Sequence, residues 1–324
     1  MEKKLEKLDE IDRNLLALLD RNSRLSLEKL SKIIKISRER LGYRIKILKK
    51  NKIIRSFHTI INPRKLGYLV FRIYCKMKNS AANNYEKFFT SLSKKEYITW
   101  TASLGGDFDS MFEILAKSPS DMLQKMGEIL RENAGIIDKY EIVLEVNSQY
   151  SNRNYLAKTE LPEISVKNFN LEQKPDQLDK KILQVISNNS RLKTIEIARI
   201  TDSTPITVSK RIKQMEKSGI IKGYSFSMSQ DELGISDYRV RIRLTSLTKE
   251  EEKRFFDYAR EHTNITNISS VIGTWSIELH LQVEDPQQYY KNILEIRTKF
   301  SEQIVAIESL LVFNFYKWSY LPDK

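Results

Sequence analysis

The sequence predicts an α+β protein that contains two winged helix-turn-helix domains and two ferredoxin-like βαββαβ domains in tandem. The first observation behind this prediction is a basic helical pattern, Ser37–Lys50, that recurs as Thr204–Lys217 at an offset of 167 residues. Two short amphipathic helical patterns precede each copy, and an isoleucine pair follows it. Farther along, the apolar spacing changes from helical to alternating, as in strands with one buried face. The chain therefore duplicates a two-domain unit.

The positive charge of the chain is concentrated in the two segments that contain the basic helices. The 324 residues carry a formal net charge of +13, and 40% of them are hydrophobic and 30% charged. Residues 1–58 hold 17 Lys and Arg against 8 Asp and Glu, and residues 179–225 hold 10 against 4. Such a local excess favours a polyanionic partner, with nucleic acid ahead of an anionic membrane surface.

Few residues are suited to metal or redox chemistry. The single cysteine, Cys75, cannot form an internal disulfide, and His58, His262 and His280 are far apart without metal-ligand spacing. No apolar run approaches the roughly 20 residues that a bilayer requires. We therefore expect a cytoplasmic protein without a cofactor, a metal or a membrane partner.

The N-terminal segment has the order of a helix-turn-helix. A first amphipathic helix begins near Asp12, Ser26 is placed to cap a second helix, and Ser37 is placed to cap the third. In the third helix, apolar residues at i, i+4 and i+7 from Leu41 leave the cationic side chains on the opposite face. The β-branched and aromatic residues over 53–61 then predict a two-stranded wing.

The segment after Leu66-Gly67 predicts the order βαββαβ. Alternation over 71–77 indicates a strand, and a helical pattern follows over 84–94. Two further strands, 97–104 and 110–116, are joined by a turn whose glycines tolerate positive φ. Pro119 opens the second helix, and 136–146 is the last strand.

The whole unit restarts after a polar segment with little periodicity. Leu66-Gly67 recurs as Leu233-Gly234 and Phe88-Phe89 as Phe255-Phe256, so one offset holds through both domains. The predicted boundaries are 1–62 for the first head, 66–147 for the first βαββαβ domain, 148–177 for a linker, 178–229 for the second head and 233–318 for the second βαββαβ domain.

This combination resembles the Lrp/AsnC, or feast/famine, family of transcription regulators. The resemblance rests on Asp12 and Asp179 opening the first helices, the Asn-Ser-Arg-Leu turns, the Arg-Ile-Lys core of each third helix, and the Gly-Gly-Asp hairpin. It covers residues 8–146 and 176–317. Members usually carry one unit per chain and dimerise. The resemblance therefore implies a pseudo-dimer inside this chain, with its two βαββαβ domains packed sheet to sheet, and it allows further homo-oligomers.

Double-stranded DNA is the expected partner, read by the third helix of each head. The candidate contacts of the first head are Arg38, Arg40, Tyr43, Arg44, Lys46 and Lys50. Those of the second head are Thr207, Ser209, Lys210, Arg211 and Lys213. Because Arg40 corresponds to Thr207 and Tyr43 to Lys210, the two heads predict an asymmetric site rather than a palindrome.

The hairpin at 105–109 resembles the effector loop of the family, which implies a small effector such as an amino acid. The candidate residues are Gly106, Asp107, Asp109 and, in the second repeat, Gly273. The second hairpin, 272–276, has lost both acids, so the two halves are not expected to bind an effector equally. The competing interpretation of Asp107 is an ordinary turn residue.

Charged residues on the polar faces of the strands predict cross-strand ion pairs where the two sheets meet. The cations are Arg72, Lys76, Arg239, Arg241 and Arg243, and the acids are Glu113, Glu141, Glu145, Glu278 and Glu308. Such pairs fix which sheet pairs with which, and a pocket for an anionic ligand is the alternative.

The function expected from these features is sequence-specific DNA binding in transcription, without enzymatic activity. One alternative is an enzyme like the siroheme decarboxylases of this architecture, which requires clustered His, Tyr and Arg around a tetrapyrrole; the sequence has no paired-His motif. The other is an architectural protein that coats DNA through charge alone, with a steep salt dependence and no sequence preference.

Overall fold

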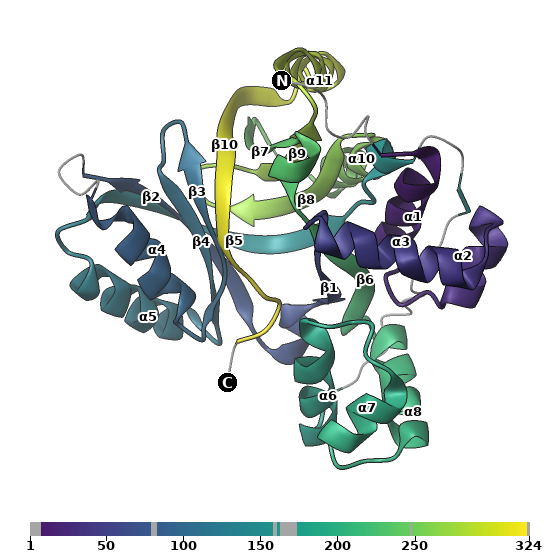
Figure 1. The fold of residues 1–324 in the computed structure, drawn as a ribbon. Helices are drawn as coiled ribbons and strands as arrows, with labels where there is room; N and C mark the ends of the chain where they lie inside the picture. The colour runs from purple at the N-terminus through teal and green to yellow at the C-terminus, as the bar shows by residue number, and fades with distance from the viewer. Residues whose placement is uncertain (1–7, 79–82, 158–160, 163–173, 247, 323–324) are drawn as a thin grey trace. The chain divides into compact units, whose positions relative to one another are not determined.

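The computed structural model describes residues 8–78, 83–157, 161–162, 174–246 and 248–322, and these form two compact units. Unit 1 combines Met1–Leu66 with Asn152–Gly234, and unit 2 combines Gly67–Ser151 with Ile235–Lys324. The two heads therefore belong to one unit and the two βαββαβ segments to the other (Figure 1). The predicted α+β fold class with a repeated unit is confirmed.

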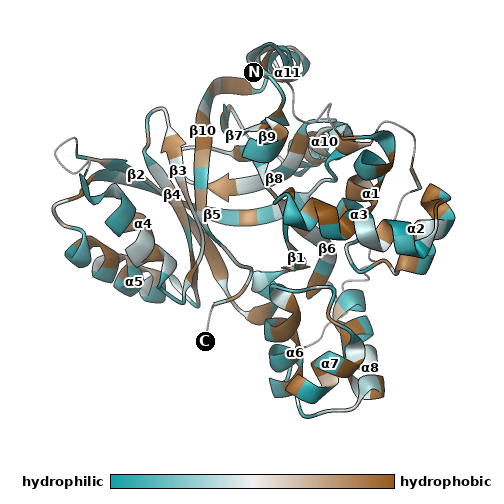
Figure 2. Cartoon of the chain, viewed as in Figure 1, coloured by the Kyte–Doolittle hydropathy of each residue, from teal (hydrophilic) through white to brown (hydrophobic). Residues whose placement is uncertain are grey.

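Each head of unit 1 contains three helices. Those of the first head are α1 (Glu10–Arg21), α2 (Leu27–Ile34) and α3 (Arg38–Lys50), and those of the second are α6 (Gln177–Ser187), α7 (Thr194–Ile200) and α8 (Pro205–Lys217). Ser26, Ser37 and Thr204 cap α2, α3 and α8 as predicted, because each hydroxyl accepts a backbone N–H three residues ahead. Hydrophobic and hydrophilic residues are mixed along these helices (Figure 2), as amphipathic packing requires.

The prediction of a two-stranded wing in each head is wrong. The segment after α3 is one strand, β1 (Ile54–Ile61), and it pairs in antiparallel fashion with β6 (Ile221–Met228) of the other repeat. Pro63, which lacks a backbone N–H, follows β1 in a short 3₁₀ helix, so the chain does not fold back on the strand. The exposed backbone groups of β1 are instead paired by the equivalent strand of the second head.

The Asn-Ser-Arg-Leu turns join the two heads within unit 1. The Arg24 guanidinium donates to the Ser190 carbonyl at 2.5 Å, and the Arg191 guanidinium donates to the Ser23 carbonyl at 2.6 Å. The hydroxyls of Ser23 and Ser190 share a hydrogen bond of 2.7 Å. These reciprocal contacts, at the offset of 167, give unit 1 a pseudo-twofold arrangement.

The beginning of the predicted linker packs on α1. The Arg13 guanidinium donates to the carbonyls of Leu156 (3.1 Å) and Tyr155 (2.8 Å), and Arg153 forms an ion pair with Asp20. These residues surround the short 3₁₀ helix Asn154–Leu156. Residues 158–160 and 163–173 of the linker lie outside the described ranges.

Unit 2 is a closed eight-stranded barrel. Its strands are β2 (Leu69–Met77), β3 (Ile98–Gly105), β4 (Ser110–Ala116), β5 (Ile137–Tyr150), β7 (Ser236–Leu244), β8 (Ile265–Ile272), β9 (Ile277–Val283) and β10 (Ile304–Trp318). Their order is β10-β3-β4-β2-β5-β8-β9-β7. The two halves were expected to pack sheet to sheet. They are instead hydrogen-bonded at both edges, through β5–β8 and β10–β3, because pairing satisfies edge strands that would otherwise stay open.

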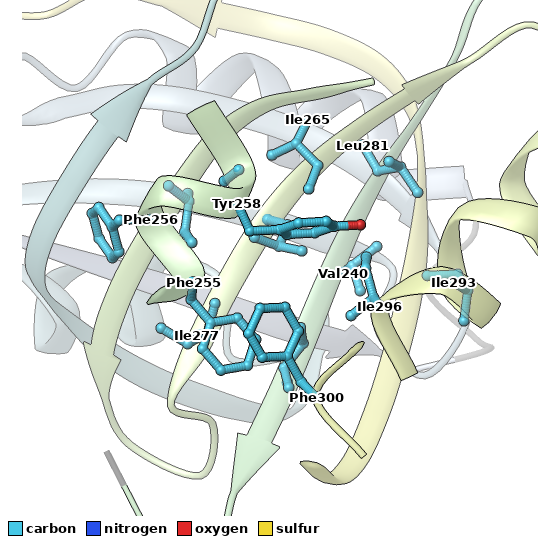
Figure 3. Close-up of a cluster of buried hydrophobic side chains, with 14 of the residues drawn as sticks. Val240, Phe255, Phe256, Tyr258, Ile265, Ile277, Leu281, Ile293, Ile296 and Phe300 are labelled. Atoms are coloured by element: carbon cyan, nitrogen blue, oxygen red, sulfur yellow. The ribbon is translucent and has the colours of Figure 1, made fainter. Parts of the chain in front are cut away.

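Four helices cover the outside of the barrel. They are α4 (Tyr85–Ser93), α5 (Pro119–Glu132), α10 (Lys249–Glu261) and α11 (Pro286–Lys299). Under α10 and α11, Phe255 stacks on Phe300 with ring centroids 3.8 Å apart, and Ile296 and Leu281 complete a buried cluster (Figure 3). The apolar faces of the strands are thus turned toward the helices, and their other faces line the barrel interior.

Within the described ranges, none of the helices has the length and apolar character needed to cross a membrane.

Candidate nucleic-acid interface

The third helix of the first head presents a cationic face to solvent. Leu41 and Leu48 bury the opposite side of α3. The exposed predicted contacts are Arg38, Arg40, Lys46, Lys50 and Tyr43, the last with 65% of its surface accessible. A capped helix with four exposed cationic side chains and one aromatic ring has the charge and the hydrogen-bond donors for phosphates and base edges.

The equivalent helix of the second head is less cationic and more apolar. Lys210 and Lys213 are exposed, whereas Thr207 and Ser209 are half-buried. The Thr207 hydroxyl lies 2.9 Å from the hydroxyl of the capping residue Thr204. Ile206, which the sequence interpretation overlooked, is 82% exposed at the position equivalent to Glu39. The sequence feature that could have revealed Ile206 is its position, because it is an isoleucine outside the buried stripe of an amphipathic helix.

Two predicted DNA contacts, Arg44 and Arg211, are held inside their own heads. Arg44 forms ion pairs with Asp9 at 2.7 Å and Asp12 at 2.8 Å. Burial alone raises the pKa of Asp9, but the backbone N–H of Asp12 and the Arg44 guanidinium lower it below its usual value. These contacts tie α3 to the start of α1, so Arg44 orients the recognition helix.

The second head repeats this clamp at the same offset. Arg211 pairs with Asp176 at 2.8 Å and with Asp179 at 3.4 Å. The acidic residue at the start of each first helix therefore has a structural function, which the sequence motif did not reveal.

The hairpin at 105–109, the predicted effector loop of the first repeat, is held by contacts with neighbouring strands of unit 2. Asp109 accepts the Met77 backbone N–H at 2.7 Å and pairs with Lys76 at 3.3 Å. Gly106 has φ +125°, and a Cβ there would lie 2.9 Å from Leu310. These contacts explain the hairpin without an effector.

The other two effector candidates, Gly273 and Asp107, also have neighbours within unit 2 that account for their conformation or charge. Gly273 has φ +157°, and a Cβ there would lie 2.7 Å from Val143, the equivalent of Leu310. Asp107 is exposed, and its carboxylate adds to the effect of burial in raising the pKa of Glu308, against the lowering effect of Arg241. These surroundings give each candidate a structural role, and effector binding at the hairpins stays a prediction.

The predicted ion pairs between strands are confirmed for Arg72 and Arg241, and these extend across the two halves. Lys76 pairs instead with Asp109, and within the described ranges neither Arg239 nor Arg243 forms a predicted pair. Arg72 is 3% exposed and donates to Glu113 at 2.9 Å, to Glu278 of the other half at 2.7 Å, and to Glu145. Burial alone raises the pKa of Glu278, but Arg72 and then Arg239 lower it below its usual value. The barrel interior therefore holds ionised groups that are paired from both repeats.

A second arginine in the interior is enclosed by aromatic rings. The Arg241 guanidinium lies 4.4 Å from the ring centroid of Tyr74 and 4.9 Å from those of Phe108 and Trp275. It pairs with Glu308 and, at 3.3 Å, with Glu141 of the other half. The sequence did not indicate this aromatic cage, because its members come from both hairpins and from β2.

Comparison with known proteins gives matches of two kinds. Residues 8–49 match the model of the AsnC-type helix-turn-helix domain, and residues 175–222 match a winged helix-turn-helix DNA-binding model. The HTH-type transcriptional regulator FL11 of Pyrococcus abyssi is 33% identical over 116 residues, which are 36% of this chain and 75% of that protein. The leucine-responsive regulatory protein of Escherichia coli K12 is 30% identical over 148 residues, covering 45% and 90%.

Solved structures of one protein, with and without a bound iron-uroporphyrin III analogue, align with nearly the whole chain. The alignment with the siroheme decarboxylase NirDL covers 97% of this chain and 94% of the NirDL chain, with a TM-score of 0.61 and 11% sequence identity. At this identity the likeness shows a common fold of tandem units.

Proposed function

We propose that this chain, which belongs to the Lrp/AsnC family, is a sequence-specific DNA-binding transcriptional regulator with two non-identical reading heads. The single observation that carries the proposal is the exposed cationic face of α3, on a helix that Ser37 caps and Arg44 clamps. Lys210 and Lys213 supply a weaker cationic face on α8. Family membership supports DNA as the polyanion.

The rigidity of each recognition helix supports sequence readout over coating by charge alone. A helix fixed by ion pairs to a neighbouring helix presents its side chains in one geometry, which base recognition requires. Arg40 and Tyr43 project from α3, whereas Ile206 and Lys210 project from α8. Arginine suits guanine and an apolar side chain suits the thymine methyl group, so the two half-sites should differ.

Fluorescence anisotropy tests this function with DNA from the chain's own upstream region and with random DNA, at about 50 and 200 mM salt. We expect tighter binding to the upstream DNA at both concentrations. Lys46→Ala should weaken binding to both DNAs and reduce the salt slope by about one. Lys87→Ala is the matched control, because it removes the same charge from an exposed position on α4, outside the heads.

Equal affinity for the two DNAs at both salt concentrations would favour the architectural alternative. An equal loss in Lys46→Ala and Lys87→Ala would contradict the assignment of α3 as the interface.

A decarboxylase-like enzyme is the second candidate function. The likeness to NirDL over the whole chain favours it, and Tyr74, Arg241 and His280 all lie on strand faces of one barrel. Against it, Tyr74 donates to Glu278 at 2.8 Å and Arg241 is enclosed by rings and carboxylates. Incubation with siroheme, followed by mass spectrometry for loss of CO₂, tests this candidate directly. Product formation by the wild-type chain would replace the regulator as the principal function.

A further inference from the structure

Arg239 is a buried arginine with two unsatisfied donor nitrogens in its guanidinium, Nε and Nη1. It lies on β7 in the barrel interior and is 2% exposed. Among the described residues, no hydrogen-bond acceptor reaches its Nε or its Nη1, although both atoms are buried. The nearby Glu278 carboxylate is already engaged, because it accepts from the Tyr74 hydroxyl and the Arg72 guanidinium. A buried charge with unmet donors is costly, so an acceptor from outside the chain would stabilise it.

The internal repeat shows how this arrangement arose. Arg239 is the equivalent of Arg72 at the offset of 167, and each is paired across its β ladder with an equivalent residue, His280 or Glu113. The four acceptors of Arg72 are Glu113, Glu145, Glu278 and Ser269. Their pseudo-symmetric equivalents around Arg239 are His280, Val312, Met111 and Ala102.

All four acceptors have thus been replaced while the arginine has been kept. None of the replacements is a carboxylate or a hydroxyl, and valine and alanine are smaller than the glutamate and serine they replace. A structural arginine that had lost its partners would be expected to be replaced by an apolar residue, since that is neutral or stabilising. Its retention in a fully buried position points to an acceptor that binds there.

We propose that the barrel interior binds a small organic carboxylate through the guanidinium of Arg239. The planar fork of an arginine matches a carboxylate through two parallel N–H donors, here Nε and one Nη. The Trp100 ring lies 5.7 Å from the guanidinium carbon and keeps the group in place from one face. His280 lies on β9, opposite Arg239 in the β ladder, and its ring centroid is 6.3 Å from that of Trp100.

The surrounding residues define the rest of the ligand. Ala102, Met111 and Val312 belong to the apolar cluster of the interior, so the body of the ligand should be apolar and compact. Phe315, whose ring centroid lies 5.4 Å from that of Trp100, is only partly buried, so this end of the interior cluster reaches solvent. A branched short-chain monocarboxylate fits this chemistry. This inference is independent of DNA binding and of any reaction.

Tryptophan fluorescence of the full chain provides the test, because Trp100 adjoins the guanidinium. The probes are sodium isovalerate, its neutral amide isovaleramide, and sodium sulfate, each titrated at constant ionic strength. We expect saturable quenching and a rise in melting temperature with isovalerate only. Arg239→Met should weaken isovalerate binding at least tenfold.

A second variant tests the repeat argument without removing the arginine. Met111→Glu restores the acceptor that Glu278 provides to Arg72, so it should raise the melting temperature without ligand and abolish the response to isovalerate. No saturable response to isovalerate in the wild-type chain would overturn the proposal, as would equal responses to acid and amide. Equal binding by wild type and Arg239→Met would also overturn it, and saturation by sulfate alone would exclude an organic ligand.

Discussion

Removal of Arg72 should destabilise unit 2 much more than removal of Arg239. Arg72→Met leaves Glu145 and Glu278 buried without their cation, and uncompensated buried charges cost about 3–5 kcal/mol. Arg239→Met removes no hydrogen bond made by Nε or Nη1, although it removes a cation that helps to lower the pKa of Glu278. It relieves two unmet buried donors, worth about 1–3 kcal/mol, and forfeits a cation–π contact of about 0.5–2 kcal/mol. The second variant should therefore lie between about 1 kcal/mol less stable and about 2.5 kcal/mol more stable than the wild type.

Urea unfolding of ligand-free protein, followed by tryptophan fluorescence, measures this difference. All three tryptophans, Trp100, Trp275 and Trp318, lie in unit 2, so the signal reports on the barrel. Equal destabilisation by the two substitutions would refute the reasoning, because it would mean that the two arginines are paired to the same extent.

The loss in free energy of unfolding caused by Arg72→Met should also depend on pH. In the wild type, the pKa of Glu278 is lowered on folding, so its contribution is present at neutral pH and is lost as the pH falls through that value. Arg72→Met removes the largest influence that lowers this pKa, so the Glu278 pKa should rise in the direction set by burial, and protonation should then relieve part of the buried charge. The loss should shrink between about pH 7 and pH 5. A constant loss over this range would contradict the assigned pairing.

Three further predictions concern individual positions. Gly106→Ala should destabilise unit 2 by about 1–3 kcal/mol in urea unfolding, because of its positive φ and the contact with Leu310, whereas Gly135→Ala, with open space around it, should have little effect. Arg44→Ala should cost only about 0.5–1 kcal/mol by circular dichroism, since its ion pairs are partly exposed; a larger loss would mean that more than the clamp is broken. Burial, with help from Arg153, lowers the pKa of His58 to about 3, so wild-type stability should fall as the pH drops below about 6.5, and His58→Gln should remove up to about 1.4 kcal/mol per pH unit of that slope. An unchanged slope in His58→Gln would show that His58 is protonated in the folded chain.

The repeat made most of the fold predictable. Each helix and strand of one half had an independent counterpart in the other, so periodicity and capping residues such as Ser37 and Thr204 could be judged twice. The strand partners were not predictable, because β1 pairs with a segment more than 160 residues away and local patterns carry no information on such pairing.

The candidate sites were predictable in composition and less so in role. The cationic face of α3 followed from helical spacing, but the clamp that occupies Arg44 depends on how α3 crosses α1. Asp109 holds its hairpin, and the sequence does not separate this role from ligand binding, because turns and binding loops use the same residues. The unmet donors of Arg239 became visible only when the partners of Arg72 were known from the fold. Both arginines lie at the same position of an alternating strand pattern, so the local sequence does not distinguish them.

Selection of binding sites from random DNA by the full chain measures directly whether the two heads read different sequences. We expect a bipartite site with two unlike halves, in which Arg40→Ala relaxes the preference in one half and Lys210→Ala in the other. Enrichment of no sequence, or of a perfect inverted repeat that both variants relax equally, would contradict two non-identical reading heads.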